Sequence, residues 1–132
     1  MQNEPIETGH PSPGPGVPVP STGGFDLIPL QSLIYLKADG SYTELYHIVE
    51  KEGTKLMTKT VSSKGLKFFE EKLVSPPFMR IHDSYIVNLT KVVRYAREGK
   101  EGRVVLYTGK SLVVSRTRKN QLLMAFGLKS EE

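Results

Sequence analysis

The stretch from Phe78 to Leu89 limits the possible folds more than any other part of the sequence. Two short apolar runs within it are separated by three polar residues, His82, Asp83 and Ser84. This pattern predicts a strand, a tight bend and a second strand. Side chains in such a bend are released from the strict alternation of a strand, so they can point at a ligand while the flanking strands anchor them. The bend is therefore the first candidate for a functional site.

Short apolar segments separated by turn signals continue through the rest of the chain. Asp39-Gly40 and Glu52-Gly53 are typical of tight hairpin turns. Besides the two strands of the central stretch, strands are expected at residues 34–37, 42–49, 55–60, 92–97, 103–107 and 111–115. Strands joined by sequential hairpins pair antiparallel. The sequence therefore predicts a mainly β fold of small, mostly antiparallel sheets.

Two short helices are expected beside the strands. Leu66, Phe69 and Leu73 recur at helical spacing, which predicts a helix of about three turns before Pro76-Pro77 stops it. A second helix is expected within residues 117–126, because apolar side chains again recur at helical spacing and a glycine follows.

The first 24 residues differ in composition from the rest of the chain. Between residues 10 and 24 there are five prolines and four glycines, and Val17 and Val19 are the only large apolar side chains. A segment of this kind buries too little apolar surface to offset the entropy lost on ordering it. The expected organisation is a disordered Pro/Gly-rich linker at 1–24, one domain at 25–128 and a tail at 129–132.

Composition and charge narrow the function classes. The chain has 132 residues and no cysteine, which excludes disulfides, thiolate catalysis and thiolate metal sites and suits a reducing cytoplasm. No apolar run approaches the roughly 18 residues needed to span a membrane. From Arg80 to Lys119 there are ten basic and three acidic residues, a balance of +7, although the whole chain carries only +4. This clustering favours a surface for a polyanion, and a solvated basic face is the alternative.

The residue types of a hydrolase triad occur together at His82, Asp83 and Ser84, but their arrangement argues against catalysis. A triad needs its members to meet from separated segments, and three consecutive residues in a bend point apart. No Gly-x-Ser-x-Gly nucleophile motif is present. The histidines, His10, His47 and His82, are too far apart for a spacing typical of metal ligands. The sequence therefore predicts no enzyme, no metal site and no cofactor.

Three separated motifs resemble the LytTR family of DNA-binding domains. The central stretch carries Arg-x-His-x-Ser-Tyr-x-Val-Asn from Arg80 to Asn88. An Ile-Tyr-Leu run, a polar turn and a tyrosine follow one another between Ile34 and Tyr42, and a Val-Ser-Arg run ends at Arg116. The resemblance covers almost the whole expected domain. It implies an elongated stack of small, mostly antiparallel sheets with one or two short helices.

In the resembled family, loops rather than a recognition helix enter the grooves of DNA. By alignment of the motifs, the resemblance implies base contacts at Thr43, Asp83 and Arg116. It implies contacts to the DNA backbone from Ser84, Ser115, Thr117, Arg118 and Lys119. Asp83 departs from the family pattern, which more often has an amide or a basic residue at this position.

The chemistry of three of these side chains allows alternative roles. Arg116 follows a strand that must bury one face, so its guanidinium can be held rigidly against guanine O6 and N7, or it contacts phosphate or solvent instead. The Asp83 carboxylate accepts from a cytosine amino group, or it pairs with Arg80 or Arg116, which is the role we expect. His82 either takes part in recognition or satisfies backbone groups inside the bend.

The resemblance implies sequence-specific binding of double-stranded DNA by the output domain of a bacterial transcriptional regulator of a two-component system. Two copies on adjacent half-sites are expected, with a receiver domain upstream or a sensor kinase as further partners if the chain is an excised domain. A free-standing small regulator is an alternative. A β-rich protein-interaction or sensor module with an incidental basic face is the alternative from another class.

Overall fold

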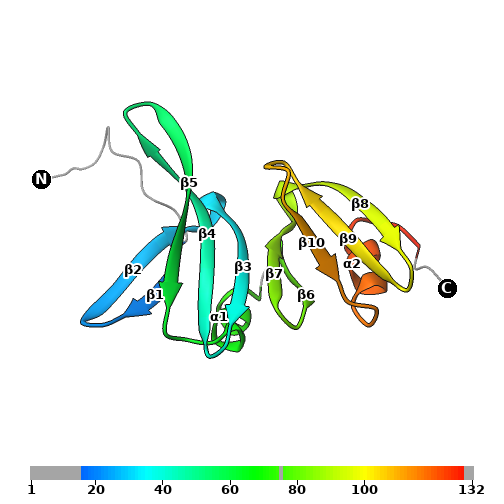
Figure 1. Ribbon diagram of the computed structural model, residues 1–132, viewed down its shortest axis with the longest axis horizontal. Helices are drawn as coiled ribbons and strands as arrows, with labels where there is room; N and C mark the ends of the chain where they lie inside the picture. Colours follow the sequence, from blue (N-terminus) through cyan, green and yellow to red (C-terminus); the bar gives the residue numbers. More distant parts are fainter. Residues whose placement is uncertain (1–15, 75, 130–132) are drawn as a thin grey trace, which may run out of the picture.

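The computed structural model describes residues 16–74 and 76–129 and forms three antiparallel sheets with two short α-helices. Figure 1 shows the two larger sheets side by side along the long axis of the molecule, with a small hairpin at one end. The first 15 residues of the expected linker and the last three residues of the expected tail lie outside the described part. Within that part, no helix has the length and apolar character needed to span a membrane.

The larger sheet has five strands in the order β5-β4-β3-β7-β6. These strands are β3 (Leu33–Asp39), β4 (Tyr42–Lys51), β5 (Thr54–Ser62), β6 (Phe78–His82) and β7 (Tyr85–Asn88), and all their pairings are antiparallel. Gly40 and Gly53 occupy the two predicted hairpin turns with φ of 60° and 80°. Glycine adopts this region without steric cost, which is why the two turn signals in the sequence are reliable.

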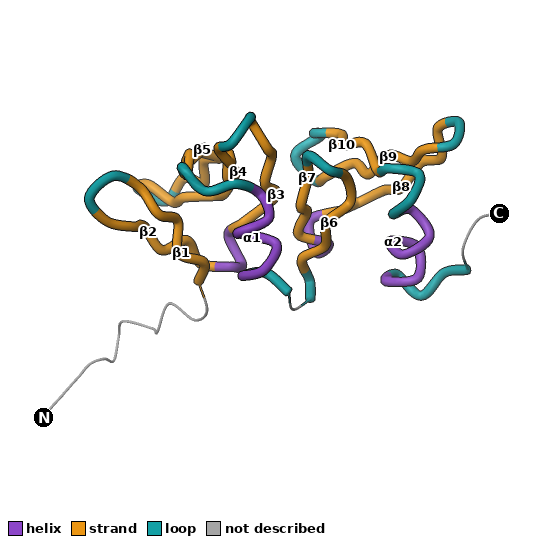
Figure 2. Tube along the Cα trace, turned by 90° about the horizontal axis from the view of Figure 1, so that it is seen from below, coloured by secondary structure: helices purple, strands orange, loops and turns teal. Residues whose placement is uncertain are grey.

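The smaller sheet has three strands in the order β10-β9-β8. Its strands are β8 (Val92–Glu98), β9 (Glu101–Leu106) and β10 (Ser111–Val114), and the helical elements are η2 (Leu30–Ser32), α1 (Leu66–Lys72), η3 (Leu89–Lys91) and α2 (Lys119–Ala125). Figure 2 shows α1 and α2 on the same side of the two sheets. The predicted mainly β fold of small antiparallel sheets with two short helices is confirmed.

Strand β3 lies between two hydrophobic clusters and is buried on both faces. Leu33 and Leu36 join the cluster around Phe69 of α1. Ile34 and Tyr35 join the second cluster, which is shared with the three-stranded sheet and α2. Two consecutive residues face the same cluster because the register of β3 shifts between Leu33 and Tyr35, as expected of a bulge. β3 therefore connects the two halves of the core.

The N-terminal hairpin corrects the expectation of a disordered linker for residues 16–24. Strand β1 (Gly16–Ser21) pairs antiparallel with β2 (Gly24–Pro29). Val17 and Val19 are fully buried in the Phe69 cluster. The Ser62 hydroxyl donates a hydrogen bond of 2.9 Å to the Pro20 carbonyl. The prediction from composition is wrong for these residues, because two alternating valines are enough to order a strand when they pack against an existing core.

Both helices are shorter than predicted, with seven residues each. Gly65 precedes α1 with an extended backbone and no side-chain cap, so the helix begins at Leu66 and not earlier. Helix α2 begins only at Lys119. The residues before α2 form turns that belong to the candidate site described below.

Candidate nucleic-acid interface

Three connecting segments lie in a row along one edge of the molecule, and we call this row the loop edge. They are the β3–β4 turn (residues 39–42), the β6–β7 bend (83–84) and the segment between β10 and α2 (115–118). Figure 1 shows all three along the lower side of the two sheets.

Backbone hydrogen bonds hold the three segments together. The Ala38 amide donates to the Ser84 carbonyl at 2.9 Å, and the Ser115 amide donates to the Ile81 carbonyl at 2.9 Å. The first bond ties the β3–β4 hairpin to the bend, and the second ties the bend to the end of β10. The loop edge is therefore a continuous surface rather than three independent loops.

Arg80 supports the bend from below. Its Nε donates to the His82 carbonyl at 2.9 Å and its Nη2 to the Asp83 carbonyl at 2.6 Å. Its Nη1 donates to Glu70 Oε1 of α1 at 2.7 Å. The side chain is only 16% exposed, so Arg80 fixes the bend and is not available to DNA.

His82 and Asn88 also hold local backbone. The Ser84 amide donates to His82 Nδ1 at 3.0 Å, and the imidazole is tilted against the Tyr85 ring at 5.7 Å between centroids. Asn88 is buried and donates from Nδ2 to the Leu33 carbonyl at 2.8 Å, while its Oδ1 accepts from the Thr90 amide at 3.0 Å. Both residues therefore satisfy backbone groups, which was one of the two roles open for His82.

The Asp83 side chain is exposed at the tip of the bend. The expectation of an ion pair between the Asp83 carboxylate and Arg80 is wrong. The Arg80 guanidinium instead donates hydrogen bonds to Glu70 and to two backbone carbonyls, one of which belongs to Asp83. Within the described residues, no ion pair joins the Asp83 carboxylate to Arg116 either. The carboxylate is therefore presented to the outside of the loop edge.

The β10–α2 segment exposes only some of the side chains that were predicted to contact DNA. Arg116 and Thr117 are exposed, whereas Ser115, Arg118 and Lys119 are half-buried. The Ser115 and Thr117 hydroxyl oxygens are 3.4 Å apart, and the Arg118 amide donates to the Ser115 carbonyl at 3.0 Å. This turn places the exposed Arg116 side chain at its apex.

Thr43 cannot serve as the expected base contact in this conformation. Its side chain has no exposed surface, and its hydroxyl donates to the Lys64 carbonyl at 2.8 Å. The cause is the alternation of β4, in which Thr43 faces inward and the preceding Tyr42 is 51% exposed. The exposed residues next to Thr43 are Ser41 and Tyr42.

Comparisons with known proteins identify the fold and the family. The family model described as the LytTr DNA-binding domain matches residues 24–127. The chain belongs to the LytTr DNA-binding domain family. Among solved structures it is similar to the LytTr DNA-binding domain of a protein described as a methyl-accepting/DNA response regulator from Bacillus cereus. That match has a TM-score of 0.62 and 22% identity and covers 86% of this chain and 97% of the other.

A comparison with curated protein sequences gave no match. At 22% identity the structural likeness shows the fold alone. The resemblance predicted from the three sequence motifs is confirmed by the family match. The family is one of DNA-binding domains, and the loop edge is the candidate surface for that binding.

In this LytTr domain, the β5–α1 segment extends the loop edge in a way that the sequence did not indicate. The bond between Thr43 and the Lys64 carbonyl places this segment beside the β3–β4 turn. Lys64 and Lys67 are exposed there, and the Lys64 ammonium lies 5.8 Å from the centre of the Phe68 ring. Two lysines outside the C-terminal basic cluster therefore add positive charge next to the loop edge.

An aromatic stack supports the LytTr loop edge from inside the core. The rings of Tyr35 and Tyr46 are stacked at 4.4 Å, and Tyr85 meets Tyr35 edge-on at 6.4 Å. The Tyr46 hydroxyl donates to Glu44 Oε1 at 2.8 Å, and this bond lowers the pKa of Glu44. Burial, followed by the bond to Glu44, raises the pKa of Tyr46, and burial raises the pKa of Tyr35. These phenols therefore stay protonated and structural.

Proposed function

We propose that this domain binds a specific sequence of double-stranded DNA through its loop edge. Asp83 and Arg116 contact base edges, and Ser84, Ser115, Thr117, Arg118 and Lys119 contact the sugar-phosphate backbone. Arginine reads guanine by two hydrogen bonds to O6 and N7, and aspartate accepts from the cytosine amino group. The two exposed side chains thus have the chemistry to read the two partners of a G·C pair or of neighbouring pairs.

The observation that carries this proposal is the pair of backbone hydrogen bonds that joins the three segments into one surface. Ala38 to Ser84 and Ser115 to Ile81 keep the bend and the β10–α2 turn in register with each other. Base recognition requires side chains held at fixed spacing, because a mobile side chain loses affinity to its own ordering entropy. A preorganised row of loops meets this requirement without a recognition helix.

The wider context follows from the same proposal. The domain is the output module of a bacterial transcriptional regulator of a two-component system, and two copies bind adjacent half-sites. The similar domain from Bacillus cereus is described as part of a response regulator, which supports a receiver domain upstream in this case as well. The input signal reaches the DNA by bringing two loop edges onto the two half-sites.

A duplex titration at two salt concentrations tests the proposal. The full chain is titrated with a duplex selected from a random pool and with a scrambled duplex, and binding is followed by fluorescence anisotropy. Contacts to phosphates make the logarithm of the affinity fall linearly with the logarithm of the salt concentration, and specificity makes the selected duplex bind tighter. A β-rich protein-interaction module would show no enrichment and no steep salt dependence, and that result would overturn the proposal.

A further inference from the structure

A cavity of about 360 Å³ opens at the junction of the two larger sheets. The residues that line it from the side of the five-stranded sheet are Gln31, Ser32, Ile48, Glu50 and Lys55, and those from the side of the three-stranded sheet are Lys91 and Tyr107. They lie in η2 before β3, near the end of β4, at the beginning of β5, in η3 and directly after β9, so the cavity is at the opposite ends of the strands from the loop edge. Its volume is within the range of about 300–1,000 Å³ that is usual for small-ligand sites.

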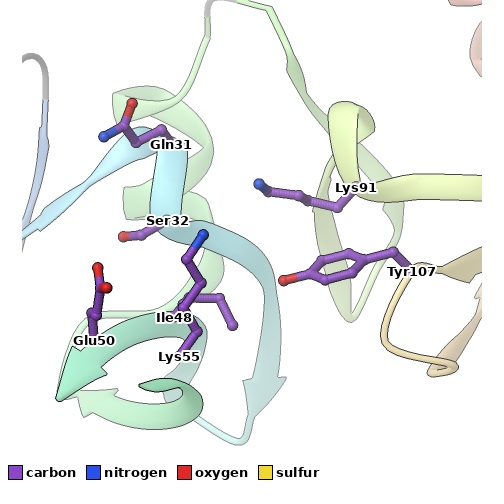
Figure 3. Close-up of a pocket in the computed structure, with 7 residues that line it drawn as sticks. All are labelled: Gln31, Ser32, Ile48, Glu50, Lys55, Lys91 and Tyr107. Carbon is purple, nitrogen blue, oxygen red and sulfur yellow. The ribbon is translucent and has the colours of Figure 1, made fainter. Parts of the chain in front are cut away.

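Three hydrogen-bond donors converge on this cavity from different elements. Figure 3 shows the Lys91 ammonium, the Lys55 ammonium and the Tyr107 hydroxyl pointing into the same space, with Ile48 below them and Glu50 on the far side. Within residues 16–74 and 76–129, no ion pair involves either lysine. Glu50 lines the same cavity opposite Lys55 in the β4–β5 register, so the two ammonium groups and this carboxylate leave a net charge of +1. An anion placed between the two ammonium groups lowers the repulsion that remains between them.

Two of the donors, Lys91 and Tyr107, are held beside each other by contacts of the backbone and of the side chains. The Tyr107 amide donates to the Lys91 carbonyl at 2.9 Å, which fixes the two residues beside each other. The Lys91 ammonium lies 5.8 Å from the centre of the Tyr107 ring, a distance at which the ring attracts the cation. Lys91 is half-buried, so less rotational freedom remains to be lost when a ligand binds.

We propose that this cavity binds a small molecule bearing a phosphate or carboxylate group, held by Lys55, Lys91 and Tyr107. Charged donors form hydrogen bonds to oxyanions that are about twice as strong as neutral ones. The ligand touches both sheets, so it holds them in a fixed relative position. The site is distinct from the loop edge, and binding there requires no DNA.

Nuclear magnetic resonance of the full chain tests the site directly. Sodium phosphate and sodium succinate are titrated in separate experiments, with sodium chloride adjusted to keep the ionic strength constant. Saturable shifts are expected for the amides of Gln31, Lys55, Lys91 and Tyr107 with one of the two anions, and that anion identifies the ligand class. Thermal unfolding should move to higher temperature in parallel, because ligand binding to the folded state stabilises it.

Matched variants separate the site from general anion binding. The double variant K55Q/K91Q should bind the same anion about tenfold more weakly or worse, because two charged donors are lost. The variant K110Q, which removes an exposed lysine from the β9–β10 turn, should bind like the wild type. Non-saturating shifts, equal binding by the double variant, or shifts only at residues 115–119 would overturn the proposal. None of these outcomes depends on whether the loop edge binds DNA.

Discussion

The Arg80 guanidinium is the support on which the bend of the loop edge depends, and replacing it with methionine tests that role. Methionine keeps much of the length and packing of the side chain but removes all three hydrogen bonds, two of them to carbonyls of the bend. Because Glu70 is 41% exposed, its ion pair contributes only about 0.5 kcal/mol. The two carbonyl bonds contribute about 1–2 kcal/mol each, at the lower end of the range for charged donors because one of them is exposed to water.

The expected loss in stability is therefore about 2–4 kcal/mol, measured as a shift of the urea unfolding midpoint. The effect on DNA should be selective. Residues 82–84 lose their support, and ordering them again costs about 1 kcal/mol each. Binding to the selected duplex should weaken by about 30- to 200-fold. Binding to a scrambled duplex should change little, because Arg80 is mostly buried and does not reach phosphates.

Two control variants sharpen the comparison. Glu70→Gln keeps both carbonyl bonds of Arg80, so its effect on the selected duplex should stay below about 1 kcal/mol. Arg80→Lys keeps the charge but loses the fork that reaches two carbonyls at once, so it should behave like the methionine variant. If Arg80→Met weakened both duplexes equally and lowered the salt slope by about one unit, Arg80 would be a phosphate contact and the positioning role would be refuted.

Four further predictions follow from the same surface and core. Arg116→Ala should cost about 1–3 kcal/mol on the selected duplex and remove the preference at one base pair, whereas Lys119→Ala should weaken all duplexes alike and lower the salt slope by about one unit. Asp83→Asn should shift the preference at one position toward adenine in a new selection if the carboxylate reads cytosine, and an unchanged selected sequence would contradict that role. Val19→Ala should lower the free energy of unfolding by about 1–3 kcal/mol, and an unchanged urea midpoint would show that the N-terminal hairpin adds nothing to the core. Burial lowers the pKa of His47, so the unfolded chain binds more protons, and stability should fall as the pH drops through the unfolded value near 6.5. In His47→Gln this loss of stability between pH 7.5 and 5.5 should be smaller.

The elements that could be predicted from the sequence are those specified by neighbouring residues. The Asp39-Gly40 and Glu52-Gly53 turns are found where they were expected, because a backbone with positive φ selects glycine locally. The bend at residues 83–84 follows from an interruption of two apolar runs, which is also a local signal. Each of the three family motifs contains part of one segment of the loop edge, so the resemblance indicates all three segments.

The features that the sequence could not show depend on contacts between distant residues. The proline-containing strand β1 is ordered because Val17 and Val19 reach a core that α1 and the five-stranded sheet build elsewhere. The predicted partner of Arg80 was wrong because Asp83 is close to it in the sequence. The fold instead brings Glu70 Oε1 of α1 within 2.7 Å of Arg80 Nη1.

Local chain geometry thus determined where this protein turns and which stretches become strands. Packing determined which side chains those strands present. Thr43 and Tyr42 are adjacent in the sequence, yet one is sealed in the interior and the other is half exposed at the loop edge. A strand sends successive side chains to opposite faces, and only the position of the neighbouring elements decides which face meets water.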